Sequence, residues 1–319
     1  MRAFLSTYGT AVAGLIVMLF FALASPVFTT PGNIILILKE TSFLAILALG
    51  FALALTTGEL DLSIAEVASL SAVLCGMLVN AGYSPALALA AGLATGLACG
   101  LSNGIAVTVL HVPSLIATLG TAAVARGLGF MITQGVAFVG RWPTSFTNVA
   151  RGTVFGIPNL VWILALAAGA SYLLVNWTRT GAHMIATGEA TEASRLAGIN
   201  TARMKMIGLI LCGGFAGVTA VLLASSLSSA APNMAGDYFL YAIAAVLLGM
   251  TMFTPGRPNV PGTLFATLTL KALGNGLVLV GAAYYVQDIV LGLIIIGSVA
   301  LSASTLTRAS FVKSLNFRT

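Results

Sequence analysis

Apolar runs separated by short polar breaks dominate the chain. A helix needs about 20 mostly apolar residues to cross the hydrocarbon core of a bilayer, and ten windows of this sequence approach that length. The windows are 8–24, 33–57, 63–81, 86–109, 114–133, 159–177, 204–224, 239–253, 260–280 and 285–303, of which the eighth is the shortest. The pattern predicts an all-α polytopic membrane protein with about ten transmembrane helices, in one transmembrane domain over residues 1–319.

Two stretches leave the pattern open to a second interpretation. The first window follows a single basic residue, Arg2, and ends in Ala22-Leu23-Ala24, which is also typical of a cleaved signal peptide. We interpret it as a retained first helix, because further apolar windows follow at once. Residues 225–237 are rich in Ser, Ala, Asn and Pro, and they could form a re-entrant segment or a half-helix.

Composition supports a membrane protein and gives an orientation. Only 7% of residues are charged, against about 25% in a soluble domain. The net charge of +6 could indicate a nucleic-acid partner, but basic residues also collect on the cytoplasmic side of membrane proteins, and we predict no nucleic acid. With both termini cytoplasmic, nine basic residues lie inside: Arg2, Arg179, Arg195, Arg203, Lys205, Arg257, Arg308, Lys313 and Arg318. Three lie outside: Lys39, Arg141 and Arg151.

Small residues and cysteines point to helix packing. The spacings Gly92-x3-Gly96-x3-Gly100 and Gly213-x3-Gly217 let membrane helices approach closely. The three cysteines lie inside apolar runs, so we interpret them as buried hydrophobic residues. Neither histidine has a Cys or carboxylate cluster beside it, so we expect no metal site. The sequence has no phosphate-binding G-x-x-x-x-G-K-[ST] loop and no nucleophile–base motif, so we expect no enzymatic activity and no cofactor bound by this chain.

The longest polar interruption runs from Arg179 to Lys205, and we expect a cytoplasmic coupling segment over about 178–203. We predict a short amphipathic helix over 189–197, with acidic residues in its first turns and a glycine cap after it. Its narrow apolar stripe of Ala193, Leu196 and Ala197 suits a groove on a partner protein. An ordinary loop with one helical turn is the alternative. The residues assigned to docking are Glu189, Glu192, Ala193, Arg195, Leu196 and Gly198.

A polar break over 58–63 separates the second and third windows. Acidic residues at membrane depth are costly unless they face a cavity or a partner, and discontinuous helices gather at transport paths. The alternative interpretation is helix capping, in which Asp61 or Ser63 caps the third helix and Glu66 follows in its first turn. The two interpretations are compatible.

Two basic residues fall inside predicted spans, Arg126 in the fifth and Lys271 in the ninth. An unpaired charge at the centre of a span costs roughly 3 kcal/mol. Neither has a carboxylate partner within its own helix, and we take this lack of paired intramembrane charges as an argument against a proton-driven secondary transporter.

Several stretches in order resemble the membrane permeases of ribose-type sugar ABC importers, a family with xylose, galactose, rhamnose and autoinducer-2 systems. They are 58–63, 102–104, 113–120 continuing to Arg126-Gly127, Thr180-Gly181, 192–200, 228–233 and 242–249. Together they span most of the chain from about residue 40 to the last window. Glu59 departs from the family pattern, where a second glycine is usual, and Met250 with its proline-rich turn replaces a more glycine-rich loop.

The resemblance implies a ten-helix permease of the bacterial cytoplasmic (inner) membrane, paired with a second copy or a sister permease. It implies ATPase subunits, which bind ATP and Mg²⁺, docked on the 189–197 coupling helix, and a periplasmic sugar-binding protein outside. Replacing Glu192 or Leu196 with a bulky or reversed group should then abolish coupling and leave membrane insertion intact. We expect the translocation path to be lined by Glu59, Asp61, Ser63, Thr118, Asn233 and Asn275. An ion-gradient-driven transporter or channel for a small polar solute remains the alternative.

Overall fold

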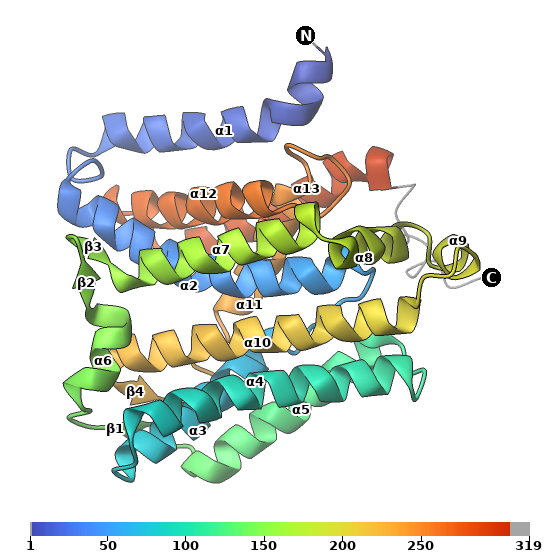
Figure 1. Cartoon of the computed structure of the whole chain (residues 1–319). Coiled ribbons are helices and arrows are strands. Elements are labelled where there is room, and N and C mark those ends of the chain that lie inside the picture. Colours follow the sequence, from blue (N-terminus) through green and yellow to red (C-terminus); the bar gives the residue numbers. More distant parts are fainter. Residues whose placement is uncertain (1, 307–319) are drawn as a thin grey trace.

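The computed structural model describes residues 2–306, and Arg308, Lys313 and Arg318 lie outside the described residues. This described part of the chain is mostly helical, with four strands of two residues each (Figure 1). The elements are α1 (Arg2–Ala24), α2 (Pro31–Thr56), α3 (Ile64–Asn80), α4 (Pro85–Thr108), α5 (Ser114–Thr133), β1 (Phe138–Val139), α6 (Thr144–Arg151), β2 (Thr153–Val154), β3 (Ile157–Pro158), α7 (Asn159–Trp177), α8 (Arg179–Glu189), α9 (Thr191–Leu196), α10 (Thr201–Leu227), β4 (Ser229–Ala230), α11 (Tyr238–Gly249), α12 (Val260–Leu279) and α13 (Tyr284–Leu306).

Each predicted apolar window coincides with a helix. Among the described residues, six helices are long and apolar enough to cross a membrane by length and composition: α2, α4, α5, α7, α10 and α12. The other four windows match shorter apolar helices, over Tyr8–Ala24, Ile64–Asn80, Tyr238–Gly249 and Tyr284–Val299. A multi-pass membrane protein is therefore established, and a count of ten spans stays a prediction.

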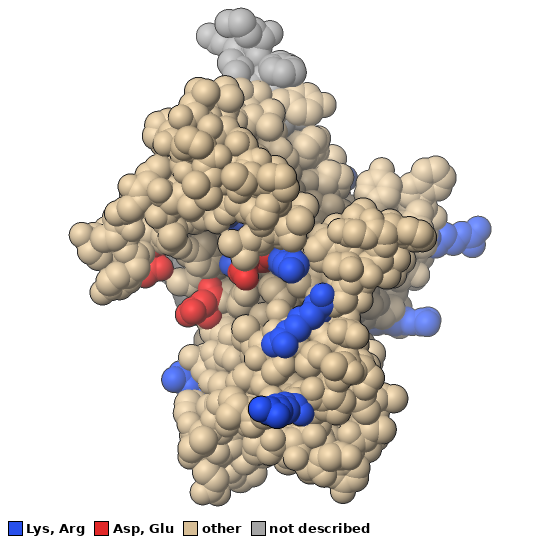
Figure 2. Space-filling view, turned by 90° about the vertical axis from the view of Figure 1, so that its left-hand side faces the viewer, with Lys and Arg blue, Asp and Glu red and all other residues tan. Residues whose placement is uncertain are grey.

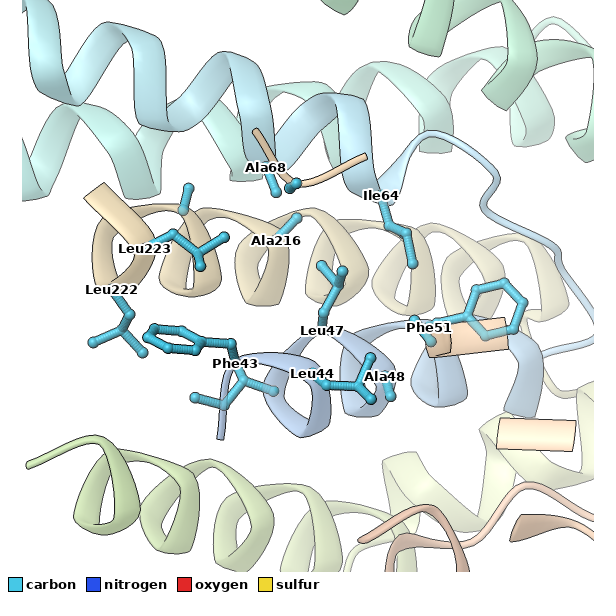
Figure 3. Packing of buried hydrophobic residues seen from close by; sticks show 14 of the residues in the cluster. Phe43, Leu44, Leu47, Ala48, Phe51, Ile64, Ala68, Ala216, Leu222 and Leu223 are labelled. Atoms are coloured by element: carbon cyan, nitrogen blue, oxygen red, sulfur yellow. The ribbon is translucent and has the colours of Figure 1, made fainter. Parts of the chain in front are cut away.

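Helix α2 lies at the centre of the bundle, in contact with α7, α10, α11 and α12. From Thr41 to Thr56 every residue of α2 is buried. In Figure 3, side chains of α2 such as Phe43 and Leu47 lie beside α10, which carries Leu222 and Ala216, and the same buried cluster continues across α10 to Ala68 of α3. A helix that is apolar all round suits such a position, because it has no face that needs water.

The predicted glycine spacings join α4 to α10. A Cβ added at Gly96 would collide with the Gly213 carbonyl oxygen, and one added at Gly213 would collide with the Gly96 carbonyl oxygen. A Cβ at Gly100 would lie 2.9 Å from the Ile210 Cα. The two helix backbones are therefore in direct contact, which confirms that these glycines serve helix packing.

The bundle has two distinct ends (Figure 1). The end that carries α8, α9 and the α2–α3 and α11–α12 turns is called the α9 end, and the end that carries α6 and the four strands is called the strand end. Strands β1 and β4 pair antiparallel, with Phe138 opposite Ala230, and so hold residues 228–237 at the strand end. Arg179, Arg195, Arg203, Lys205 and Arg257 lie at the α9 end, whereas Arg141 and Arg151 lie at the strand end. The structure thus groups these basic residues as predicted.

Residues 225–237 are not a half-helix. Helix α10 continues to Leu227, three residues beyond the predicted window, and Ser228 ends it in the left-handed conformation at φ 49°. Among the helices that match the predicted windows, α11 is the shortest, with 12 residues.

Candidate functional site

Helix α8 is fixed to the bundle through backbone contacts at the α9 end. A Cβ added at Gly181 would collide with the Leu174 carbonyl oxygen of α7, and one added at Gly188 would collide with the Thr56 carbonyl oxygen of α2. The Glu189 carboxylate forms an ion pair with the Arg257 guanidinium in the α11–α12 turn. A cavity of about 280 Å³ lies between these elements. Helix α8 is therefore attached to three parts of the bundle.

The structure corrects the predicted helix over 189–197. Glu189 is the last residue of α8, and Ala190, at φ −152° and ψ 76°, separates it from α9. Glu189 therefore lies at a helix C-terminus, where the helix dipole disfavours a carboxylate. The ion pair with Arg257 offsets this cost, and sequence spacing gave no indication of that partner.

Helix α9 presents most of its side chains to the surroundings. Leu196 is 83% exposed, Ala193 and Ala197 are also exposed, and Ser194 is its buried residue. Glu192 and Arg195 form an ion pair with each other at 2.9 Å. Gly198, at φ 85°, ends the helix as predicted. The Ile199 amide donates to the Ser194 carbonyl and the Gly198 amide to the Arg195 carbonyl, which is the Schellman arrangement.

A second ion pair joins α10 to the break after α2. The Lys205 ammonium lies 2.6 Å from the Glu59 carboxylate, whose side chain is only 8% exposed. Both residues line a cavity of about 300 Å³ at the α9 end, together with Ser114 and Thr191. Glu59 is a charged residue at a position where the resembled family usually has a glycine. Lys205 of α10 supplies the opposite charge.

Removing Lys205 should destabilise the protein measurably. In Lys205→Ala the Glu59 carboxylate stays buried without its partner, at a cost of about 1–3 kcal/mol. We expect a lower midpoint of thermal unfolding in detergent, partly restored by adding Glu59→Gln, which removes the unpaired charge. Arg195→Ala is the control, because its ion pair is exposed and such pairs contribute under about 1 kcal/mol. Equal midpoints for Lys205→Ala and Arg195→Ala would contradict this prediction.

Asp61, Ser63 and Thr118 belong to one buried hydrogen-bonded cluster. The Asp61 Oδ1 accepts from the Ser63 amide at 2.9 Å and from the Ser63 hydroxyl at 2.5 Å, and the Asn103 amide donates to the Ser63 Oγ at 2.9 Å. The Leu62 amide donates to the Thr118 Oγ1 at 3.1 Å. Burial raises the pKa of the Asp61 carboxyl, although both Ser63 hydrogen bonds act in the opposite direction.

Of the two expected caps of α3, Ser63 is wrong, whereas the Asp61 carboxylate does accept from the backbone amide of Ser63 at the start of the helix. Ser63 is the N-cap residue, but its side chain makes no capping hydrogen bond. The reason is that the Ser63 hydroxyl donates to Asp61 and accepts from Asn103 on α4 instead. Glu66 does lie in the first turn of α3, as expected.

Lys271 inside α12 is paired with a carboxylate, contrary to the predicted lack of paired intramembrane charges. The Lys271 ammonium of α12 lies 3.4 Å from the Glu40 carboxylate of α2, and it also lies 4.7 Å from the Tyr238 ring centroid. The sequence showed no carboxylate partner for Lys271 within its own helix. Glu40 lies on another helix, 231 positions from Lys271. The Lys271–Glu40 ion pair therefore removes the lack of paired charges as an argument against a secondary transporter.

The six residues predicted to line a path fall into separate groups. Glu59, Asp61, Ser63 and Thr118 lie around the α2–α3 break and the start of α5. Asn275 exchanges two hydrogen bonds of 2.9 Å with Asn33 and borders a cavity of about 760 Å³ between α2, α11, α12 and α13. Asn233 is exposed in the turn after β4, at φ 61°. Sequence reasoning missed Glu40, Asn103 and the pairing of Lys205 and Arg257 with carboxylates, because each partner comes from a distant helix.

Comparison with known proteins identifies the family of the chain. A family model described as the permease component of a branched-chain amino acid transport system matches residues 33–299. The chain is 34% identical over 302 residues to the ribose import permease protein RbsC of Escherichia coli K12, which covers 92% of this chain and 93% of that protein. The chain belongs to the ribose-type ABC importer permease family.

Two further relatives of this permease support the same family. It is 35% identical over 287 residues to RbsC of Bacillus subtilis 168, covering 90% of this chain and 89% of that protein. It is 32% identical over 292 residues to the L-arabinose transport system permease protein AraH of E. coli K12, covering 92% and 89%. No solved structure gives a significant match. Within residues 2–306, no group of three or more His, Cys, Asp or Glu that could hold a metal ion is found.

Proposed function

We propose that this permease is the membrane-spanning subunit of an ATP-driven importer in the bacterial inner membrane, and that its solute is a monosaccharide or a similar small polyol. The similarity to ribose and L-arabinose permeases over nine-tenths of the chain carries this proposal. The α9 end would face the cytoplasm, because five of its basic residues gather there.

Helices α8 and α9 would be the docking surface for the ATPase subunits, which supply the bound ATP and Mg²⁺. The exposed Leu196 offers an apolar anchor, of the kind that a groove on a partner accepts. The contacts of Gly181 with α7, of Gly188 with α2 and of Glu189 with the α11–α12 turn fix this surface to helices that cross the bundle. A movement of α9 would therefore be transmitted to those helices through direct contacts.

A second permease, either another copy or a sister chain, would cover the free face of α5. Arg126 is exposed about midway along this helix, and a charge there is costly against lipid. On the same helix Gly120 and Gly127 are exposed, and a Cβ added at either would meet no atom within 4 Å. Small residues of this kind let another helix approach closely.

The strand end would face the periplasm and receive a sugar-binding protein. Strand pairing holds residues 228–237 beside residues 138–139 there, and helix α6 adds a further ordered surface next to them. The permease itself then needs only weak affinity, because the binding protein captures the solute.

The proposal is tested by purifying the tagged protein from its native membrane and reconstituting whatever complex accompanies it. We expect an ATPase to co-purify, and we expect the proteoliposomes to take up D-ribose or L-arabinose only with ATP and a sugar-loaded binding protein. L-leucine is the comparison solute, because the family description includes amino-acid systems. Uptake that continues without ATP and follows an ion gradient would overturn the proposal in favour of a secondary transporter.

A further inference from the structure

The strand-end half of the bundle contains a large cavity that the proposed docking surfaces do not use. Helix α11 has 12 residues and so spans about 18 Å, whereas the hydrocarbon core measures about 30 Å. A cavity of about 760 Å³ lies beside the first turn of α11, at Leu240 and Tyr241, and is also bordered by α2, α12 and α13.

The cavity opens at the strand end. Figure 2 shows this face of the molecule hollowed, with acidic side chains gathered at one side of the hollow. Asp237 precedes α11 and Asp288 lies in the first turns of α13, and both are exposed and border the cavity. Glu40 lies about 14 Å from the first residue of α2, yet its side chain is 43% exposed. Because Glu40 is also one of the residues that line the cavity, the cavity extends to this depth in the bundle.

The base of the cavity is a fixed polar cluster. The Lys271 ammonium lies 3.4 Å from the Glu40 carboxylate, 4.7 Å from the Tyr238 ring centroid and 5.5 Å from the Tyr241 ring centroid. Charged groups at this depth face an aqueous cavity or a partner and mark the route of a solute in membrane proteins.

The charged residues that line the cavity indicate which class of ligand it can bind. Three carboxylates, those of Glu40, Asp237 and Asp288, face a single ammonium, that of Lys271, and this balance disfavours anions. The lysine is already paired with Glu40, so no free cation remains among these residues for the carboxylate of an amino acid. Carboxylates accept hydrogen bonds from the hydroxyl groups of a ligand. The side-chain amides of Gln287 and Asn275 can both accept hydrogen bonds from such hydroxyl groups and donate hydrogen bonds to them.

Apolar surface completes the wall. The Tyr241 and Tyr284 rings and Leu240 border the same cavity, and aromatic faces pack against apolar C–H groups while the Tyr hydroxyl keeps a polar contact. A cavity of this volume with a few convergent polar groups is typical of a small-molecule site. A neutral polyhydroxylated molecule matches both kinds of surface.

We infer that this cavity is a low-affinity binding site for a neutral polyol such as a monosaccharide, on the side where the solute arrives. The inference rests on the proposed function and adds to it the place at which the permease itself contacts its solute. The site is separate from the Asp61–Ser63–Asn103 cluster, whose side chains are buried and hydrogen-bonded to one another.

A cysteine-protection experiment tests the site in the complete permease without its ATPase. Gln287→Cys places a thiol in the cavity wall, and Leu227→Cys places one on the exposed strand end. The native Cys75 and Cys212 are buried, and Cys99 is partly buried. We expect D-ribose or L-arabinose to slow alkylation of Gln287→Cys by a membrane-impermeant maleimide, about tenfold when the sugar exceeds its Kd tenfold. Alkylation of Leu227→Cys should not change.

A second measurement uses the reconstituted complex. Asp288→Asn should raise the KM for sugar-loaded binding protein about tenfold and leave the amount of bound ATPase unchanged. Unchanged alkylation of Gln287→Cys in millimolar sugar, or protection by L-leucine or sodium ions alone, would overturn the inference, as would a thiol that the reagent does not reach. If the wild-type complex still imports sugar in that case, the proposed function stands and only the site is wrong.

Discussion

Replacing Gly213 by valine is expected to prevent the bundle from assembling. The Cβ of any side chain at this position would collide with the Gly96 carbonyl oxygen and lie 2.8 Å from the Gly100 Cα. These are backbone atoms of α4, so rotation of a side chain cannot relieve the collision, and the two helices must separate. Overpacking of a core costs about 1–3 kcal/mol when side chains can adjust, so we expect a cost of about 3 kcal/mol or more here.

The measurement is size-exclusion chromatography of detergent extracts with the protein carrying a fluorescent tag. Gly213→Val should give little monodisperse protein. Gly169→Val is the matched control, because Gly169 is exposed on α7 and an added Cβ there would meet no atom within 4 Å. Equal monodisperse peaks from the two variants would show that α4 and α10 do not need this contact.

Leu196→Asp is expected to separate the permease from its ATPase while leaving it folded. The Leu196 side chain is 83% exposed, so the substitution removes almost no contact within the chain. A central apolar anchor of an interface contributes about 2 kcal/mol or more, which corresponds to roughly 30-fold weaker binding. We expect ATP-driven sugar uptake to fall to background and the co-purified ATPase to disappear.

The control for this experiment is Leu227→Asp, the same change at a residue that is 58% exposed at the strand end. It should retain the ATPase. Glu192→Ala should have a smaller effect than Leu196→Asp, because the Glu192 carboxylate already pairs with Arg195 of its own helix. An ATPase that remains bound to Leu196→Asp would place the docking surface elsewhere at the α9 end.

Helix positions and family could be predicted from the sequence because the signals are local. Each apolar window became a helix, since a run of apolar residues has one low-cost conformation in a bilayer. The Gly96 and Gly213 spacings indicated close packing, and Gly198 indicated a helix end. In each case the residues that decide the structure lie within a few positions of one another.

The polar residues were predicted less well, because their environment depends on distant partners. Glu189 has the spacing of a helix start, but its ion pair with Arg257 accompanies a helix end. Ser63 does not cap α3, because its hydroxyl donates to Asp61 and accepts from Asn103. A pattern read along one helix contains no information about which other helix supplies a hydrogen-bond partner.

The sequence by itself determined a helical membrane protein of the ribose-type permease family, with a short helix and an apolar side chain in its main polar segment. Only the tertiary structure decided that Lys271 pairs with Glu40, that Lys205 pairs with Glu59, and that a cavity lies beside the first turn of α11 at the strand end. The physical reason is that burial of apolar residues follows local composition, whereas ion pairs and cavities depend on which helices become neighbours in the folded bundle.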